Sequence, residues 1–271
     1  MPANAAAAKA FHALHQGAAP LVLANCWDAG SARLIESLGA KAVATTSAGF
    51  AWSLGYPDGD AVPVGVLAKA VGAVARVVKV PVSVDMEGGY SKDPALVGNA
   101  AARVVDAGAV GINIEDGSDK PEALVAKIAA IRQSTAKLGV DLFINARTDV
   151  YLRGLAPPET RVETVLARAR QYIAAGASGI FVPGLTDAAA IKQIASAVDR
   201  PLNVMASKGL PPLADLAKLG VKRLSAGAAM SMVLWAHAAQ LAGAFLKEGR
   251  SDKVTEGAMA YGEINKLFQG L

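Results

Sequence analysis

The chain of 271 residues has a single cysteine, Cys26, and only 5% aromatic and 18% charged residues. One thiol excludes a disulfide framework and any zinc site built from several cysteines. Lysine and arginine occur one or two at a time, without a basic run or a basic and aromatic stripe. The net charge of +4 therefore predicts no nucleic-acid partner. We expect a reducing, cytoplasmic setting.

Membrane and export signals are also scarce. The first residues lack a positive segment followed by a leucine-rich run, so we expect no signal peptide. One uncharged run, residues 226–246, is long enough to span a membrane, but its Ala, Gly, Ser, His and Gln content suits hydrocarbon poorly. This run is typical of a buried or intersubunit helix, and we expect no membrane partner.

Apolar residues make up 53% of the chain, which excludes a disordered protein. They gather in short continuous runs, as expected for parallel strands buried on both faces. Eight such runs occur, at residues 21–26, 42–47, 81–87, 111–116, 142–148, 179–184, 202–207 and 223–228.

Helical patterns separate the eight runs, and five of the helices end at a glycine suited to a left-handed residue. A strand and helix repeated eight times predicts an α/β protein with a (β/α)₈ TIM barrel as one domain, residues 1–271. An open doubly wound sheet is the alternative, but no G-x-G-x-x-G follows the first run. We expect an extra helix at residues 5–16, one at about 228–248 and a last one at about 252–268. The five glycines are Gly39, Gly108, Gly139, Gly176 and Gly220.

Acidic residues concentrate where the third and fourth strands end, the end at which barrel enzymes place their chemistry. Asp85 and Glu87 are two residues apart and point the same way, and Glu115 adds a third carboxylate from the next strand. Three carboxylates in one mouth repel one another unless a cation neutralises them. We therefore expect a Mg²⁺ site held partly through water, with Mn²⁺ as an option. The alternative is that these acids pair with Arg147 or cap the helices that follow.

Two further features at the same end suit a carboxylate ligand. Arg147 fits a bidentate clamp on a substrate carboxylate or phosphate, although a structural ion pair is the alternative. We expect a glycine-interrupted loop after the second strand, where backbone N–H groups of Ser47, Ala48 and Gly49 could cradle an anion. The two glycines after Glu87 would let backbone approach a ligand closely.

The remaining reactive side chains have ordinary interpretations. His12 and His15 lie on the first helix, far from the mouth, and are expected to be solvated, and His237 is expected to be a core or interface residue. Cys26 is expected to be a small buried thiol rather than a nucleophile. Lys208 could form a Schiff base, as a minority alternative.

Taken as a set, the motifs resemble the isocitrate lyase and phosphoenolpyruvate mutase superfamily, over nearly the whole chain. The resemblance implies a (β/α)₈ barrel whose eighth helix is exchanged between subunits, so that the helices at 228–248 and 252–268 pack on a neighbour. It also implies a homo-oligomer, either a dimer or a dimer of dimers. The motifs are NCWDAGSARLIESLGAKAVATTSAGFAWSLGYPD, VPVSVDMEGGY, GAVGINIED, INARTDVYL and GVKRLSAGAA.

The resemblance also implies roles for individual residues. Asp85, Glu87 and Glu115 match the family's magnesium-site acids, with Glu87 where many members have Asp. Asp58 matches an acid that supports the water shell of the metal. Substrate-binding positions of the family match Ser47, Ala48, Gly49, Arg147 and Asn203.

Departures from the family narrow the expected chemistry. The long lid after the fourth strand, with its cysteine acid, is missing, and the sixth strand ends in Val182, Pro183 and Gly184 where relatives place Glu or His. The proton donor is left among Tyr90, a metal-bound water and Cys26. We expect a lyase or decarboxylase acting on a small 2-oxo acid or related carboxylate through an enolate held on Mg²⁺. The alternatives are phosphonopyruvate hydrolase or mutase chemistry and a binding homologue with little catalysis.

Overall fold

Eight parallel strands form the centre of the computed structural model, which describes residues 5–270. The hydrogen-bonded order is β1-β8-β7-β6-β5-β4-β3-β2, and the bridge from Cys26 to Thr45 brings the β1 and β2 ends of this sheet together. The structure thus confirms the (β/α)₈ barrel and all eight runs, although each strand is shorter than its run. The strands are β1 (Leu21–Leu23), β2 (Val43–Ala44), β3 (Val82–Asp85), β4 (Gly111–Glu115), β5 (Phe143–Arg147), β6 (Gly179–Phe181), β7 (Leu202–Met205) and β8 (Arg223–Ser225).

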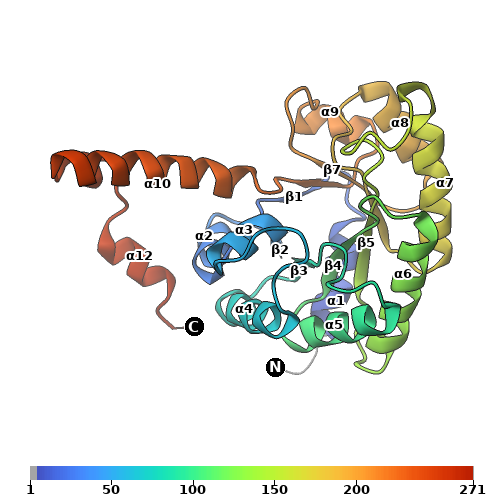
Figure 1. The fold of residues 1–271 in the computed structure, drawn as a ribbon, viewed down its shortest axis with the longest axis horizontal. Helices are drawn as coiled ribbons and strands as arrows, with labels where there is room; N and C mark the ends of the chain where they lie inside the picture. Colours follow the sequence, from blue (N-terminus) through green and yellow to red (C-terminus); the bar gives the residue numbers. More distant parts are fainter. Residues whose placement is uncertain (1–4, 271) are drawn as a thin grey trace.

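Helices surround the barrel (Figure 1). Capping side chains and glycines mark where several of them begin and end. The Asp93 carboxylate caps α5 by accepting from Ala95 N at 2.9 Å, and Gly108 beyond the helix end has a φ of 118°. All five predicted helix-ending glycines have positive φ. The helices are α1 (Ala5–Leu14), α2 (Ala29–Ser37), α3 (Ser47–Ser53), α4 (Val64–Val77), α5 (Pro94–Asp106), α6 (Pro121–Ala136), α7 (Arg161–Ala174) after the 3-10 turn η1 (Pro158–Thr160), α8 (Ala188–Ala197), α9 (Leu213–Lys218), α10 (Ala229–Glu248), α11 (Asp252–Thr255) and α12 (Tyr261–Leu267).

Two sequence-based expectations about helices were wrong. The segment after β2 begins with the helix α3 instead of a loop. Gly49 lies in this helix at a point where a Cβ would come within 2.8 Å of the Trp27 and Thr46 side chains. The last helix, expected at about 252–268, is divided into α11 and α12. Gly257, with a φ of 70°, lies in the interruption and turns the chain between the two.

The α1 helix closes the amino-terminal end of the barrel. Phe11 is fully buried against Gly111, where a Cβ would meet the Phe11 ring at 2.5 Å. His15 stacks on Phe143 with ring centroids 4.1 Å apart and is 1% exposed. The expectation that His15 is solvated was therefore wrong, because its ring fills the space between α1 and β5. His12 keeps partial exposure and lies 3.1 Å from the Asp141 carbonyl.

Burial of His15 predicts a pH-dependent stability. Burial, reinforced by the Arg223 charge and by His12, lowers the pKa of His15 to about 3, whereas the pKa of the imidazole in the unfolded chain keeps its ordinary value of 6.5. Stability from the neutral ring is present above pH 6.5 and is lost as the pH falls toward 3. Lowering the pH from about 8 to about 5 should therefore reduce the free energy of unfolding by about 2 kcal/mol through His15.

Urea unfolding of wild type and His15→Phe at both pH values measures this contribution. The variant should lose less stability on acidification, by about the amount assigned to His15. Equal losses in wild type and His15→Phe would contradict the prediction.

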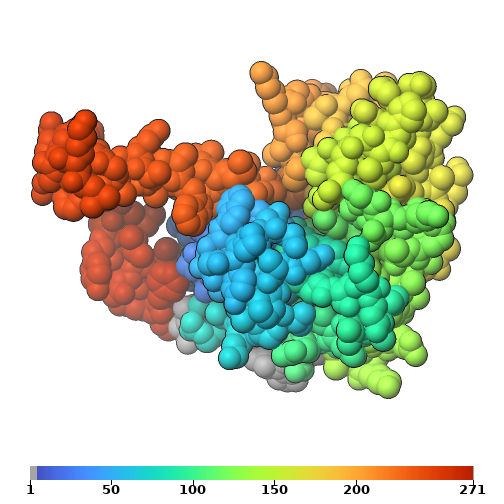
Figure 2. Space-filling model, in the orientation of Figure 1, coloured from blue at the N-terminus to red at the C-terminus, as the bar shows by residue number. Residues whose placement is uncertain are grey.

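The long helix α10 leaves the barrel instead of packing on it (Figures 1 and 2). Only Ser231 on α10 is buried, and Val233 and Leu246 are 68% and 86% exposed. The chain returns through α12, where Arg33 Nε donates to the Leu267 carbonyl at 2.6 Å. By length and composition α10 is the one described helix that could cross a membrane, which on its own is weak support for a span. In the single chain it is not a core helix, so the buried alternative was wrong and the intersubunit one stays a prediction.

An apolar groove lies on the barrel wall beside the departing helix. Val22 of β1 is 46% exposed, although it belongs to a barrel strand. The groove measures about 560 Å³ and runs between α1, β1 and α2. Its apolar lining includes Leu14, Leu21, Val22, Ile35, Leu38 and Met230.

Candidate active site

Charged side chains meet at the carboxyl ends of β3, β4 and β5. Asp85, Glu115 and Arg147 are the last residues of these three strands, and Glu115 and Arg147 are direct register partners. Adjacent parallel strands thus bring all three to one edge of the barrel. The prediction that these residues share a mouth is confirmed.

Asp85, like Glu87 and Asp58, makes no ion pair among residues 5–270. Its Oδ1 accepts from the Glu87 amide at 3.3 Å, and the Ser47 amide also bonds to it. Burial raises the pKa of Asp85, while Arg147 opposes this and Asp58 adds to it. The Asp85 carboxylate therefore sits in a partly desolvated position next to further negative charge, which a bound cation would relieve.

Arg147 is held between two acids. Its Nη1 lies 2.6 Å from Glu115 Oε2, and its Nε lies 2.7 Å from Asp149 Oδ1. Burial alone would lower the pKa of Arg147, but Glu115 and Asp149 outweigh burial and raise it. The structural ion pairs expected as the alternative are present, and each terminal nitrogen keeps an N–H free for a ligand.

Glu87 binds a neighbouring loop. Its Oε2 accepts from the Gly59 amide at 2.8 Å and from the Asp60 amide, and the Tyr90 hydroxyl donates to Oε1 at 3.2 Å. Asp60 reciprocates, because its Oδ1 accepts from the Tyr90 amide at 2.9 Å. We call residues 58–60 the mouth loop. Glu87 and Asp60 together latch it to the segment after β3.

Backbone strain is concentrated in this latch. Asp60, Glu87 and Tyr90 have φ values of 58°, 51° and 60°, and they are the only non-glycine residues with positive φ in the described part of the chain. Such conformations cost about 1 kcal/mol or more each and persist only where neighbours impose them. Gly88 serves the latch as well, since a Cβ there would lie 2.5 Å from Asp60 Oδ2, whereas Gly89 packs against Val97 and Ile114. The expected role of these two glycines in letting backbone approach a ligand stays a prediction.

Removing the latch should free the mouth loop. In Glu87→Ala the Gly59 and Asp60 amides lose a charged acceptor, so their hydrogen exchange should quicken by about tenfold or more. Exchange mass spectrometry on peptides covering residues 55–61 measures this rate. Glu122→Ala, an exposed change in the first turn of α6, is the control. Unchanged exchange in Glu87→Ala would show that other contacts hold the loop.

The predicted anion cradle occupies the first turn of α3. Ala48 and Gly49 are buried, and their amides precede Phe50, whose amide makes the first turn-closing bond to Thr46 at 2.9 Å. First-turn amides have no intrahelical acceptor, so they can bond to an anion. The Ser47 amide already faces Asp85. The exposed Asp58 is close enough to interact with both Asp85 and Glu87.

Asn203, a predicted substrate-binding residue, lies inside the barrel and not at the end of its strand. It is the second residue of β7, is 1% exposed, and its amide is used inside the barrel. Its Nδ2 donates to Ser225 Oγ at 3.1 Å, and its Oδ1 accepts from Asn145 at 3.1 Å. Asn113 and the fully buried Arg223 continue this polar network. A substrate-binding role for Asn203 stays a prediction.

A buried hydrogen-bond network around Asp116, which sequence reasoning missed, supports Arg147 through Asp149. Asp116 Oδ2 accepts from Arg168 and from the Tyr172 hydroxyl, each at 2.6 Å, and its Oδ1 accepts from the Asp149 amide at 2.9 Å. Asp149 in turn bonds Arg147. The adjacent acids in the sequence IED were the available signal, but only the fold reveals that the second one turns away from the mouth.

The other reactive side chains take no part in the mouth. Cys26 is fully buried, and burial raises the pKa of its thiol to about 12. Lys208 is exposed beyond the end of β7. His237 is exposed on α10 of the single chain.

The donor set fits a metal ion that keeps most of its water. In residues 5–270 no three His, Cys, Asp or Glu side chains are arranged to hold an ion among them. Glu87 serves the latch and Glu115 serves Arg147, which leaves the Asp85 carboxylate available. Mg²⁺ is usually bound through one or two carboxylates, water and substrate, so this arrangement suits it. The assignment of Glu87 and Glu115 to the metal stays a prediction.

Comparisons with known proteins give a consistent result. The family model described as phosphoenolpyruvate phosphomutase matches residues 11–246. An uncharacterized protein of Mycobacterium tuberculosis is 38% identical over 80% of this chain and 81% of its own. The oxaloacetate decarboxylase of Paraburkholderia xenovorans is 34% identical over 77% and 71%, and the 2-methylisocitrate lyase of Escherichia coli is 30% identical over 72% and 68%.

Solved structures agree with these sequence matches. A protein of Burkholderia cenocepacia provisionally named a lyase or mutase is 34% identical, with a TM-score of 0.87 over 98% of this chain and 96% of its own. Another from the same organism, provisionally named a phosphonomutase, is 40% identical, with a TM-score of 0.82 over 87% and 98%.

Proposed function

The chain belongs to the phosphoenolpyruvate mutase and isocitrate lyase superfamily, and from this premise we propose that it is a Mg²⁺-dependent carbon–carbon lyase or decarboxylase. Its substrate is a small 2-oxo acid or a related carboxylate. The observation that carries the proposal is the Asp85 carboxylate, which has no ion-pair partner in the described chain and faces Arg147 and the first turn of α3. Asp85 would thus hold a cation close to two groups suited to a substrate carboxylate.

The residues of the mouth have separate roles in this proposal: they bind the substrate, hold the metal or position the mouth loop. Arg147, fixed by Glu115 and Asp149, offers its free N–H groups to the substrate carboxylate, and the Ala48 and Gly49 amides offer a second set of donors. Asp85 would hold Mg²⁺ or Mn²⁺, with Asp58 supporting the water shell, and a bound ion would supply Lewis-acid stabilisation of negative charge on the 2-oxo oxygen. Glu87 holds the mouth loop next to this region.

Tyr90 is the proton donor in this proposal. Burial raises the pKa of its phenol, and the nearby Glu87 and Asp85 charges raise it further, so the hydroxyl stays protonated. Its hydroxyl donates to Glu87 Oε1 at 3.2 Å, which orients the group at the edge of the mouth. A phenol with a raised pKa is a weak acid, so Tyr90 would give its proton only to a strongly basic centre such as the carbanion left by bond cleavage, and water would then return a proton to the tyrosinate.

A direct assay tests the proposal. Pyruvate formation is followed from oxaloacetate and other 4-carboxylated 2-oxo acids, and from the hydroxy acid 2-methylisocitrate, with Mg²⁺ and with a chelator. Metal-dependent turnover of at least one compound supports the proposal, and no metal-dependent turnover of any would overturn it. Borohydride trapping of substrate on Lys208 would instead support Schiff-base chemistry.

Phosphorus–carbon chemistry is the second candidate. It is favoured by the description of the matching family model and by the name of the 40% identical structure. It predicts release of phosphate or phosphoenolpyruvate from phosphonopyruvate. A homologue that only binds would show 2-oxo acid binding by calorimetry without product.

We also propose that α10 packs on a second copy of the chain, as part of a dimer or a dimer of dimers. The groove beside Val22 and the exposed apolar side of α10 support this, because both leave large apolar surface uncovered in one copy. In this assembly α10 is an intersubunit helix and not a membrane span, in keeping with a cytoplasmic location.

A charged residue on α10 should disrupt the assembly. Val233→Glu would place an unpaired charge in the interface, weakening association by about 2 to 4 kcal/mol. Light scattering after size-exclusion chromatography should show dissociation as the protein is diluted. Leu96→Glu is the control, since Leu96 is similarly exposed at 56% but lies on α5. If both variants keep the wild-type mass at every concentration, α10 does not form the interface.

A further inference from the structure

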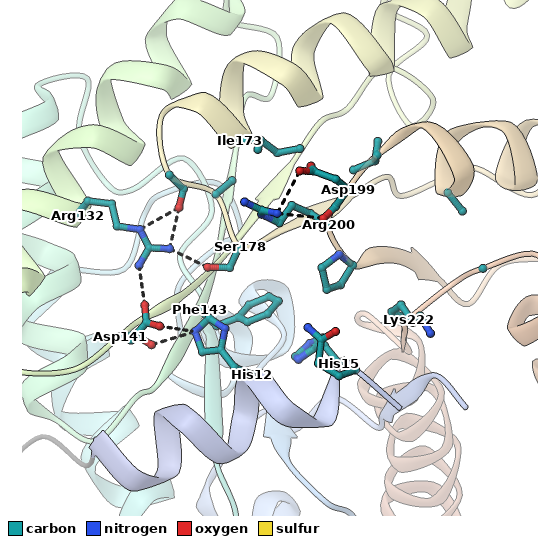
Figure 3. Close-up of a pocket in the computed structure, with 17 residues that line it drawn as sticks. His12, His15, Arg132, Asp141, Phe143, Ile173, Ser178, Asp199, Arg200 and Lys222 are labelled. Atoms are coloured by element: carbon teal, nitrogen blue, oxygen red, sulfur yellow. Dashed lines mark hydrogen bonds and ion pairs between the residues drawn. The ribbon is translucent and has the colours of Figure 1, made fainter. Parts of the chain in front are cut away.

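A second cavity lies at the opposite pole of the barrel from the acidic mouth. It measures about 560 Å³, within the size range of small-molecule sites. Its walls come from α1 and from the segments that lead into β5, β6, β7 and β8 (Figure 3). The cavity shares no residue with the mouth, so it requires its own explanation.

Positive charge predominates around this cavity. Arg132 donates to the carbonyls of Leu142 and Gly176 and to Ser178 Oγ, so its guanidinium is fixed as part of the wall. The two acids of the lining are already paired. Asp141 lies 3.5 Å from His12 and 3.6 Å from Arg132, and Asp199 lies 3.2 Å from Arg200.

Lys222 is the cation left without an acid. Its Nζ donates to the Gly17 carbonyl at 2.9 Å and makes no ion pair within residues 5–270. In Figure 3 it lies apart from the Arg132 and Asp141 cluster, on the far side of the cavity. Arg200 also keeps donors free, because only its Nη1 contacts Asp199. Two cations with unused N–H groups suit a doubly charged oxyanion.

The cavity also offers a buried hydrogen-bond acceptor. His15 Nδ1 lies 2.8 Å from the Phe11 carbonyl, which assigns the ring proton to Nδ1 and leaves the lone pair on Nε2. His15 is 1% exposed, and its Nε2 has no partner in the structure. A buried acceptor without a donor is costly, so a hydroxyl group on a ligand would satisfy it.

We propose that this cavity is a binding site for a small phosphate ester that carries a hydroxyl group. Lys222 and Arg200 bind the phosphate, and His15 Nε2 accepts from the hydroxyl. The site is independent of the proposed catalytic function, because it lies at the other end of the barrel. Phosphate is favoured over a carboxylate because two cations, and not one, have donors to spare.

Calorimetry on the full-length protein with glycerol 3-phosphate and with inorganic phosphate tests the proposal. Glycerol 3-phosphate should bind at millimolar concentrations, and more tightly than inorganic phosphate. Lys222→Met should weaken its binding by about tenfold or more. Lys218→Met, an exposed lysine paired with Asp215 outside the cavity, is the matched control and should bind like wild type.

Further variants separate this site from the mouth and from misfolding. Asp85→Asn must bind glycerol 3-phosphate like wild type, whereas Arg200→Gln must weaken the binding of glycerol 3-phosphate. Asp85→Asn and Arg200→Gln must both keep the wild-type circular dichroism spectrum. Undiminished binding in Lys222→Met, or loss of binding in Asp85→Asn, would overturn the proposal. Binding of malate that depends on Lys222, without binding of either phosphate, would overturn the choice of phosphate.

Discussion

Asp85→Asn should reduce kcat/KM by about a thousandfold for whichever substrate the assay identifies, equivalent to roughly 4 kcal/mol of transition-state stabilisation. The amide keeps the shape of the side chain but removes the charge that would hold the metal. Titration calorimetry should show that Mg²⁺ binding is lost in the same variant. Thermal stability should be unchanged or higher, because one of several mutually repelling buried charges is gone.

Asp93→Asn is the matched control for this substitution. Asp93 caps α5 at the surface, and asparagine caps a helix about as well as aspartate does. Its turnover and Mg²⁺ affinity should equal those of wild type. Turnover of Asp85→Asn within tenfold of wild type would show that Asp85 is not the metal ligand.

Asp116→Ala should lower the unfolding free energy by about 3 to 5 kcal/mol. The substitution leaves the Arg168 guanidinium and the buried Tyr172 hydroxyl without their acceptor, and it frees the Asp149 amide. For a chain of this size the melting temperature should fall by on the order of 10 °C. Urea unfolding monitored by circular dichroism measures the change.

An exposed ion pair provides the comparison for Asp116. Asp215 lies 2.7 Å from Lys218, but both side chains are more than half exposed. Asp215→Ala should therefore change stability by no more than about 0.5 kcal/mol. A loss in Asp116→Ala as small as this would mean that the buried network reorganises or is hydrated once the carboxylate is removed.

The barrel could be predicted from the sequence because each βα unit carries its own signal. The strand that ends at Asp85 lies in an apolar run with β-branched valines, and Gly108 marks the end of the helix that follows. Such local signals do not depend on contacts distant in sequence. The α3 helix was missed because Gly49 lowers helix propensity, whereas its packing against Trp27 requires a residue without a Cβ.

The candidate site could be predicted only as far as strand ends determine it. Parallel strands bring Asp85, Glu115 and Arg147 together whatever surrounds them. Whether an acid faces a ligand or a neighbouring residue depends on contacts across the fold. Glu87 reaches a loop twenty-eight positions away along the chain, and Asp116 reaches Tyr172 across fifty-six. No pattern within a short window carries those partners.

The pairing of β1 with β8, the first and last strands, has a consequence for how the protein reaches its native state. Asn25 Oδ1 accepts from the Ala226 amide, a bond between residues 201 positions apart. Loop closure over such a separation is slow, and strands left unpaired until then are open edges that can aggregate. A ribosome-bound chain cannot close its barrel until residue 226 has emerged. Truncations before β8 should consequently yield insoluble protein even though most of the helices and strands are present.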